Sequence, residues 1–113
     1  MTERRFSGVE RLWGEEGADR LRDASVTVVG VGGVGSWVVE ALARTGISQL
    51  RLIDADHVAE SNINRQLPAL DNTLGRLKAE VLAERVELIN SQAHVDVVDD
   101  FVALENIECL FTD

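Results

Sequence analysis

The segment at residues 26–35, VTVVGVGGVG, places an apolar β-branched run directly before closely spaced glycines. Gly30, Gly32 and Gly35 have the spacing G-x-G-x-x-G, and Gly33 is an additional glycine within it. A helical pattern follows at once, and a strand, a glycine turn and a helix in this order form an anion site at the helix N-terminus. Gly30 would allow the tight turn, Gly32 the close approach of a phosphate, and Gly35 the close packing of helix on strand. We predict a nucleotide phosphate loop; the alternative is a turn that needs small residues only for packing.

Strands and helices are predicted to alternate along the rest of the chain. We expect strands at 26–31, 50–53 and 94–98, a helix at 36–45, and a second helix capped by Asn72 or Thr73 and ended by Asn90. The near-continuous apolar run at 26–31 is typical of a parallel strand buried on both faces. This pattern predicts an α/β, Rossmann-like fold, with a mostly parallel sheet, flanking helices and an incomplete doubly wound unit.

The two ends of the chain differ from this central pattern. Residues 1–25 are mixed and charged, and they predict a helical arm, broken at Gly14, before a nucleotide-binding domain at 26–113. A short helix at 104–109 and the start of a fourth strand at 110–111 are expected near the end. A half-sheet leaves an exposed edge that pairs or aggregates, so we expect this segment not to be a stable monomer.

Charge and cysteine content narrow the function classes. A formal net charge of −9 argues against a dedicated nucleic-acid surface within this segment. A single cysteine, Cys109, excludes an internal disulfide and a cysteine-rich zinc site. We also find neither a signal-peptide pattern nor an apolar run of membrane-spanning length, so we expect a soluble, cytoplasmic protein.

A polar cluster follows the predicted strand at 50–53, and its side chains suit chemistry at a phosphate. Asp54, at the end of that strand, can accept hydrogen bonds from a ribose, and an aspartate can also hold Mg²⁺. Arg65 and Lys78 can neutralise charge that builds up on phosphate in a transition state. Asn62 and Gln66 can position phosphate oxygens by hydrogen bonds. The full set, which includes Gly75 at the start of G-x-x-K, is Asp54, Asp56, Asn62, Asn64, Arg65, Gln66, Gly75 and Lys78. Hydride transfer would leave most of them unexplained, so we favour a reaction at an α-phosphate.

The motifs GVGGVGS, LIDADHV, NINRQ and GRLKAE resemble, in order and spacing, those of the E1-like adenylating superfamily. This superfamily includes the molybdopterin- and thiamine-pathway adenylyltransferases and the activating enzymes of ubiquitin. The segments RFSGVERLWGEEGADRLRDA and KAEVLAERVELIN are most similar to its branch of tRNA threonylcarbamoyladenosine dehydratases. The resemblance covers residues 5–102, and it implies that the chain is an N-terminal part of a longer protein.

The resemblance implies an ATP-dependent ligase-type reaction in which a carboxylate attacks the α-phosphorus, pyrophosphate leaves and an acyl-adenylate forms. In the dehydratase branch the carboxylate belongs to the threonyl group of a modified adenosine in tRNA. An internal nitrogen then displaces AMP and closes a ring, so that the net result is dehydration. The surface that binds tRNA would lie in the part of the protein beyond this segment.

The same resemblance implies roles for individual residues around ATP and Mg²⁺. Gly33 and its neighbours would face the ATP phosphates, and Asp54 would bind the ribose. Lys78 would lie across the triphosphate from a set of lining residues. That set is Ser61, Asn62, Asn64 and Arg65.

Two further assignments lie near the ends of the chain. Arg11 matches an arginine that reaches into the partner subunit's site, which implies a homodimer. Asp113, in the ending CLFTD, is the candidate for a late aspartate that serves Mg²⁺ and adenylation in the family.

Four functions remain open at this stage. The first is adenylation and cyclising dehydration of threonylcarbamoyladenosine in tRNA. The second is adenylation of the C-terminus of a ubiquitin-like sulfur-carrier protein, with a sulfur-transfer or ubiquitin-like partner. The third is a nucleotide-binding or dimerisation fragment without catalysis. The fourth, an NAD-dependent oxidoreductase, follows from the glycine loop alone.

Overall fold

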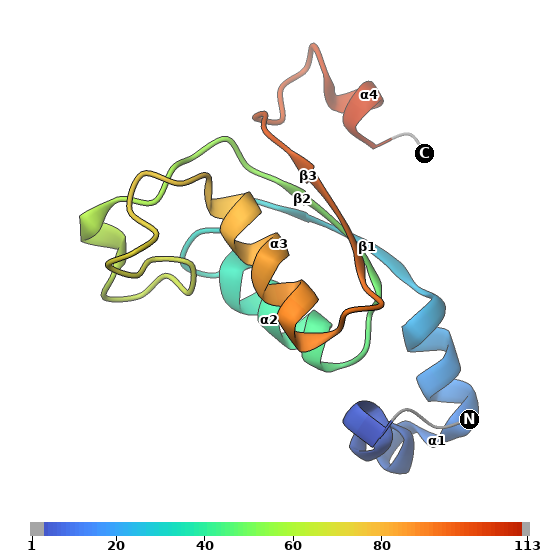
Figure 1. Ribbon diagram of the computed structural model, residues 1–113. Helices are drawn as coiled ribbons and strands as arrows, with labels where there is room; N and C mark the ends of the chain where they lie inside the picture. Colours follow the sequence, from blue (N-terminus) through green and yellow to red (C-terminus); the bar gives the residue numbers. More distant parts are fainter. Residues whose placement is uncertain (1–3, 112–113) are drawn as a thin grey trace.

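Three parallel strands form the frame of the molecule in the computed structural model, which describes residues 4–111 (Figure 1). They lie in the order β1-β2-β3, and both neighbouring pairs are parallel. The elements are η1 Arg4–Phe6, α1 Ser7–Asp23, β1 Ser25–Val29, α2 Gly35–Arg44, β2 Gln49–Ile53, η2 Glu60–Asn62, α3 Lys78–Ile89, β3 His94–Val98 and α4 Ile107–Leu110. This arrangement confirms the predicted α/β, Rossmann-like class and the third strand at 94–98.

The hydrophobic core lies between the sheet and the helices α2 and α3, which cover the same face of the sheet (Figure 1). Its buried members are Val28, Val31, Val39, Ala43, Ile47, Leu50, Leu52, Ala79, Leu82 and Val86. The prediction that the first strand is buried on both faces is wrong for the described chain. Successive side chains of a strand point to opposite faces, and Val29, next to buried Val28, is 52% exposed. β1 is also an edge strand of this sheet, as expected for a half-sheet.

The start of α3 differs from its prediction. The helix begins at Lys78 and not after Asn72 or Thr73, because tertiary contacts hold the preceding residues outside the helix. Gly75 has a φ of 84° and its N–H donates to the carbonyl oxygen of Val58 at 2.9 Å. The Thr73 hydroxyl donates to Pro68 O at 2.6 Å and therefore closes a turn. As a result Lys78 is the first residue of α3.

Other boundaries follow the local sequence signals more closely. Gly46 has a φ of 97° just after α2, and Asn90 is the C-cap of α3. The expected fourth strand at 110–111 is wrong, because Leu110 ends the short helix α4. Within residues 4–111, none of the helices has the length and apolar character that crossing a membrane requires.

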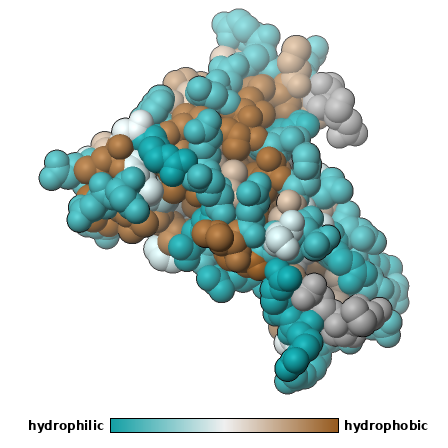
Figure 2. All heavy atoms as spheres, viewed as in Figure 1, coloured by the Kyte–Doolittle hydropathy of each residue, from teal (hydrophilic) through white to brown (hydrophobic). Residues whose placement is uncertain are grey.

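The helix α1 forms an arm with no buried residue. It is kinked at Gly14, which has φ 80° and ψ 168°, so the predicted break in the arm is confirmed. The Arg5 guanidinium donates to Ile89 O at 3.1 Å and the Ser48 hydroxyl donates to Arg22 O at 2.8 Å, which attach the arm to the body. Apolar patches lie among polar surface on the face that Figure 2 shows.

Candidate nucleotide-binding site

The glycine loop follows β1 and turns sharply into α2. Gly30 has a φ of 81°, a left-handed conformation that favours glycine, and its N–H donates to Ile53 O at 2.9 Å. A Cβ at Gly35 would lie 1.8 Å from the carbonyl oxygen of Gly30. Both glycines are therefore required by the fold itself, and the tight turn and close helix packing predicted for them are confirmed.

Within the described residues, the fold does not require glycine at positions 32 and 33. A Cβ at Gly33 would meet nothing within 4 Å, and one at Gly32 would first meet Gln66 Nε2 at 3.6 Å. Neither residue has a positive φ. Among the described residues no side chain caps the N-terminus of α2. These two glycines thus leave open space in front of helix N–H groups, where an anion can approach.

Asp54 connects the glycine loop to the polar loop after β2. Asp54 is only 7% exposed, and its carboxylate Oδ2 accepts a hydrogen bond from the N–H of Val31 at 2.8 Å. Oδ1 accepts from the N–H of Asp56 at 2.7 Å. A carboxylate has about four lone-pair sites, so two such bonds leave acceptor capacity for a ribose hydroxyl. The sequence prediction had not foreseen this structural role of Asp54.

Asn62 and Arg65 lie in the polar loop together with two of their predicted partners. Asn62 is buried, and its Oδ1 accepts from Ala59 N at 2.9 Å, so its side chain also stabilises the loop. The Arg65 Nη1 donates to Ser61 O at 3.1 Å and to Asn64 Oδ1 at 3.0 Å. The Arg65 side chain therefore contacts both Ser61 and Asn64 at an exposed part of the loop.

Gln66 is the polar residue of this loop that lies nearest to the glycines. It is 9% exposed, and its Oε1 has no hydrogen-bond partner among the residues that the structure describes. A buried acceptor without a partner costs about 1–3 kcal/mol. The amide lies beside Gly32, where its oxygen or nitrogen would meet a bound molecule.

Lys78 brings a buried positive charge to the start of α3. The residue is 6% exposed, and its Nζ lies 3.9 Å from Asp56 Oδ2, a long ion pair. Its backbone N–H donates to Asp56 O at 3.0 Å. A buried charge needs close partners, and a phosphate group would supply them. Asp56 itself is exposed.

Two residues at the start of α2 hold the polar loop, and the sequence had not indicated this role for either of them, since Trp37 was expected to pack in the core or at an interface. The indole N–H of Trp37 donates to Arg65 O at 3.1 Å. The hydroxyl of Ser36, which is fully buried, donates to Gly32 O and accepts from Leu67 N at 3.4 Å. No local pattern signals such contacts, because they join segments about thirty positions apart.

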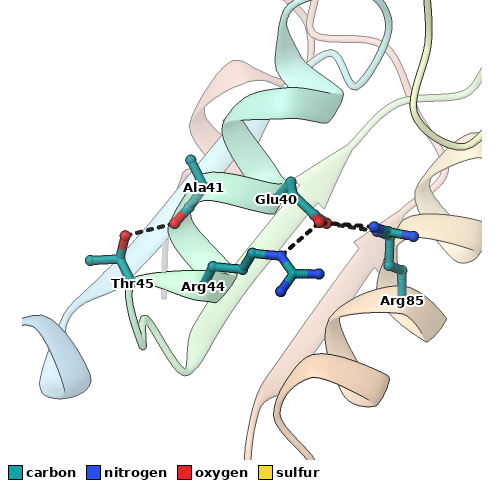
Figure 3. A network of polar contacts seen from close by, with 5 residues as sticks. All are labelled: Glu40, Ala41, Arg44, Thr45 and Arg85. Atoms are coloured by element: carbon teal, nitrogen blue, oxygen red, sulfur yellow. Dashed lines mark hydrogen bonds and ion pairs between the residues drawn. The ribbon is translucent and has the colours of Figure 1, made fainter. Parts of the chain in front are cut away.

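A polar network joins α2 to α3 behind the site (Figure 3). Arg85 donates from Nε to Glu40 Oε1 at 2.6 Å and from Nη2 to Oε2 at 2.9 Å, and Arg44 Nε donates to Oε2 at 2.8 Å. These hydrogen bonds, first that of Arg85, outweigh the partial burial of the group and lower the pKa of Glu40 from 4.5 to about 2. The helix after the glycine loop is thereby fixed to the helix that carries Lys78.

The remaining predicted residues are not part of this cluster. Arg11 is exposed on α1, and Asp113 lies outside the described residues. Within residues 4–111 no three side chains of His, Cys, Asp or Glu come together as a metal site. A cavity of about 150 Å³ between α1 and the turn after α2 is lined by Phe6, Val9 and Gly46, and none of the predicted site residues lines it.

Comparison with known proteins gives three informative similarities. The tRNA threonylcarbamoyladenosine dehydratase of Haemophilus influenzae is 56% identical over 92% of this chain and 40% of its own length. The molybdopterin-synthase adenylyltransferase of Salmonella typhimurium is 39% identical over 74% of the chain and 34% of its own length. The crystal structure of E. coli tRNA N6-threonylcarbamoyladenosine dehydratase in complex with ATP superposes with a TM-score of 0.93 at 52% identity.

These similarities also define how much of the relatives the chain represents. That E. coli match covers 94% of this chain and 44% of the E. coli chain, so the chain spans less than half the length of these relatives. A family model described as the ThiF family matches residues 7–113. The match includes the glycine loop, the polar loop and Lys78. The chain belongs to the ThiF family.

Proposed function

We propose that this chain is the nucleotide-binding part of an enzyme that uses ATP to adenylate a carboxylate. The observation that carries the proposal is the space at Gly32, bordered by the unpaired amide oxygen of Gln66. A ligand at this place would account for both the missing Cβ at Gly32 and the missing partner of Gln66. The similar E. coli structure is a complex with ATP, which supports a nucleotide as that ligand.

The residues of the site divide between binding and charge stabilisation. ATP would supply the adenylyl group that activates the carboxylate. The N–H groups at Gly32 and Gly33 would bind phosphate oxygens, and the free lone pairs of Asp54 would accept a ribose hydroxyl. Arg65 and Lys78 would stabilise the negative charge that develops on the departing pyrophosphate.

Magnesium belongs to this proposal as a companion of ATP. Mg²⁺ usually keeps several waters and is held by one or two carboxylates together with substrate phosphates. The exposed carboxylate of Asp56 beside Lys78 fits such a shared site without a dedicated cluster. We propose Asp113 as the second carboxylate.

The acceptor carboxylate is proposed to be the threonyl carboxylate of threonylcarbamoyladenosine in tRNA. The identity of 56% to a tRNA threonylcarbamoyladenosine dehydratase supports this choice over the other substrates of the family. The net charge of −9 supports a tRNA-binding surface outside this segment. A cytoplasmic location is part of this proposal.

A homodimer is proposed in which the arm at 1–25 extends from the domain at 26–113 towards a second copy. Apolar side chains on the arm and at the start of α2 support this arrangement, because such exposure is typical of interfaces. Leu12 is 72% exposed, Trp13 63% and Val34 80%. Arg11 lies on the same arm and would reach the partner subunit's phosphates.

A second candidate is adenylation of the C-terminal carboxylate of a ubiquitin-like sulfur-carrier protein. The identity of 39% to a molybdopterin-synthase adenylyltransferase favours it over unrelated carboxylates. The phosphate chemistry would be the same in both cases, and only the acceptor would differ.

Exchange of radiolabelled pyrophosphate into ATP by the native-length protein tests the proposal. We expect exchange with tRNA that carries threonylcarbamoyladenosine, and loss of exchange in Arg65→Ala and Lys78→Ala. Exchange only with a sulfur-carrier protein would select the second candidate. ATP binding without any exchange would indicate a non-catalytic nucleotide-binding module, and binding of NAD in place of ATP would indicate the oxidoreductase.

A further inference from the structure

We propose that Trp37 is a positioning residue for Arg65, and that its indole N–H sets the place of this arginine relative to the phosphate loop. The inference rests on the proposed function, because it assigns Arg65 to the ATP phosphates. The inference gives Trp37 a role in the site that neither the residue type nor the glycine motif indicates. Trp37 acts through the main chain of Arg65 and does not itself touch the reacting atoms.

The contact joins two segments that the sequence separates widely. Trp37 lies in the first turn of α2, directly after the glycine loop, and its Nε1 is 3.1 Å from the carbonyl oxygen of Arg65. The bonds of the Arg65 guanidinium to Ser61 O and Asn64 Oδ1 lie within the polar loop. Those local bonds do not fix the loop against α2, whereas the bond of Trp37 does.

The residues next to Trp37 and Arg65 in the sequence also connect the start of α2 and the glycine loop to the polar loop. Ser36 accepts from Leu67 N at 3.4 Å and donates to Gly32 O. Gln66, between Arg65 and Leu67, places its amide 3.6 Å from the position that a Cβ of Gly32 would occupy. Three consecutive loop residues thus face the glycine loop or the first turn of α2, and Trp37 holds the one that carries the charge.

The exposure of Trp37 makes it possible to test its role in positioning Arg65 separately from any role in core packing. The residue is 53% exposed, so its ring contributes less to the core than a buried tryptophan would. Trp37→Phe keeps an aromatic ring and removes the N–H donor, and water can then reach the carbonyl of Arg65. The fold should therefore persist while the loop loses a fixed point. Small displacements of a charged group reduce catalysis strongly, since electrostatic stabilisation depends on preorganised geometry.

Leu88 provides a control for this substitution. It is a large apolar side chain, it is 88% exposed, and it lies near the end of α3, ten positions after Lys78. In pyrophosphate exchange by the native-length protein, we expect Trp37→Phe to lower kcat roughly fivefold with KM for ATP within about twofold. Leu88→Ala should match the wild type. Equal kinetics for the two variants would overturn the inference.

A double-mutant cycle tests whether Trp37 acts through the Arg65 side chain. Arg65→Ala keeps the backbone carbonyl that Trp37 contacts but removes the guanidinium. Trp37→Phe should therefore cause no further loss of kcat in the Arg65→Ala background. An undiminished effect in that background would show that Trp37 acts by another route, and the inference would be wrong.

Trypsin gives a readout that needs no activity, because it cleaves after Arg65. Loss of the Trp37 bond should free this part of the loop, so cleavage between Arg65 and Gln66 should be several-fold faster in Trp37→Phe than in Leu88→Ala or the wild type. Mass spectrometry of short digests measures the rate. An unchanged rate would refute the inference, whereas absence of exchange in the wild-type protein would refute the proposed function alone.

Discussion

Glu40 on α2 and Arg85 on α3 form an ion pair of two hydrogen bonds, of 2.6 Å and 2.9 Å, across the helices that lead away from the glycine loop and Lys78 (Figure 3). Arg44 adds a third hydrogen bond to the same carboxylate. The Glu40 side chain is only 14% exposed, so solvent screens this pair less than a surface pair. The pair therefore stabilises the relative position of two parts of the candidate site.

Glu40→Gln should lower the free energy of unfolding at pH 7 by about 1–2 kcal/mol, since the half-exposed Arg85 loses a charged partner. A carboxyl group whose pKa falls from 4.5 to about 2 on folding contributes stability above pH 4.5, and this contribution is lost as pH falls towards 2. The difference between variant and wild type should thus shrink over that window. Urea titrations at several pH values measure it.

Glu16→Gln is the control for the Glu40 substitution. Glu16 also pairs with an arginine one turn away, but both side chains are highly exposed, at 81% and 79%. Exposed pairs of this kind contribute little, so no measurable change is expected. An equal loss of stability in both variants would contradict the special role of the Glu40 pair.

Gly35→Ala should prevent or severely weaken folding, because its Cβ would lie 1.8 Å from the carbonyl oxygen of Gly30. A backbone shift of that size costs about 3 kcal/mol or more. Gly33→Ala is the matched variant, since its Cβ would meet nothing within 4 Å. It should fold normally and bind ATP roughly tenfold more weakly. Thermal melts and calorimetry with ATP would separate the two effects, and equal ATP affinity in Gly33→Ala would contradict the phosphate-loop role.

Lys78→Met should weaken ATP binding by roughly ten- to a hundredfold while stability stays equal or rises. The reason is that the buried ammonium has a long ion pair of 3.9 Å to Asp56 and therefore gains little in the absence of ligand. Calorimetry gives the affinity and urea midpoints give the stability. A large loss of stability with unchanged affinity would assign Lys78 to the fold and not to the nucleotide.

Gln66→Met should raise the free energy of unfolding by up to about 1 kcal/mol, because it removes a buried acceptor that lacks a partner among the described residues. The same change should reduce ATP affinity, since the amide would no longer meet the ligand at Gly32. Urea titrations of the free protein measure the change in stability, and calorimetry with ATP measures the change in affinity. If the variant were less stable and still bound ATP normally, Gln66 would have a purely structural role.

Local signals in the sequence predicted most of the fold. Periodicity and glycine placement located the strand at 94–98, the break at Gly14 and the end of α3 at Asn90, because each depends on residues close in sequence. The start of α3 was predicted wrongly because the contact of Gly75 with Val58 is tertiary. The prediction that β1 is buried on both faces was wrong for a related reason. Only the assembled sheet defines which of its faces the helices cover.

The candidate site was predictable in its residue types but not in its connections. Glycines and polar residues at family spacing indicated the phosphate loop, Asp54, Arg65 and Lys78. The hydrogen bonds of Asp54 to Val31 and of Trp37 to Arg65 depend on how distant segments pack, so no spacing rule contains them. The nucleotide-binding roles of the phosphate loop, Asp54, Arg65 and Lys78 stay predictions, as do those of Arg11 and Asp113.

The register of the sheet has a consequence for how this site can change over evolutionary time. Val29, Ile53 and Val98 lie side by side at the ends of the three strands, at spacings of about 4.8 Å set by backbone hydrogen bonds. The glycine loop begins directly after β1, and Asp54 directly follows β2. The paired strand ends therefore set the distance between them, and the length of the polar loop that follows does not affect it. Insertions and exchanges in that loop would therefore alter the contacts of Asn62, Arg65 and Gln66 but leave the spacing of the glycine loop and Asp54 intact. The proposed phosphate and ribose contacts at the strand ends can thus be inherited unchanged while those of the polar loop diverge between lineages.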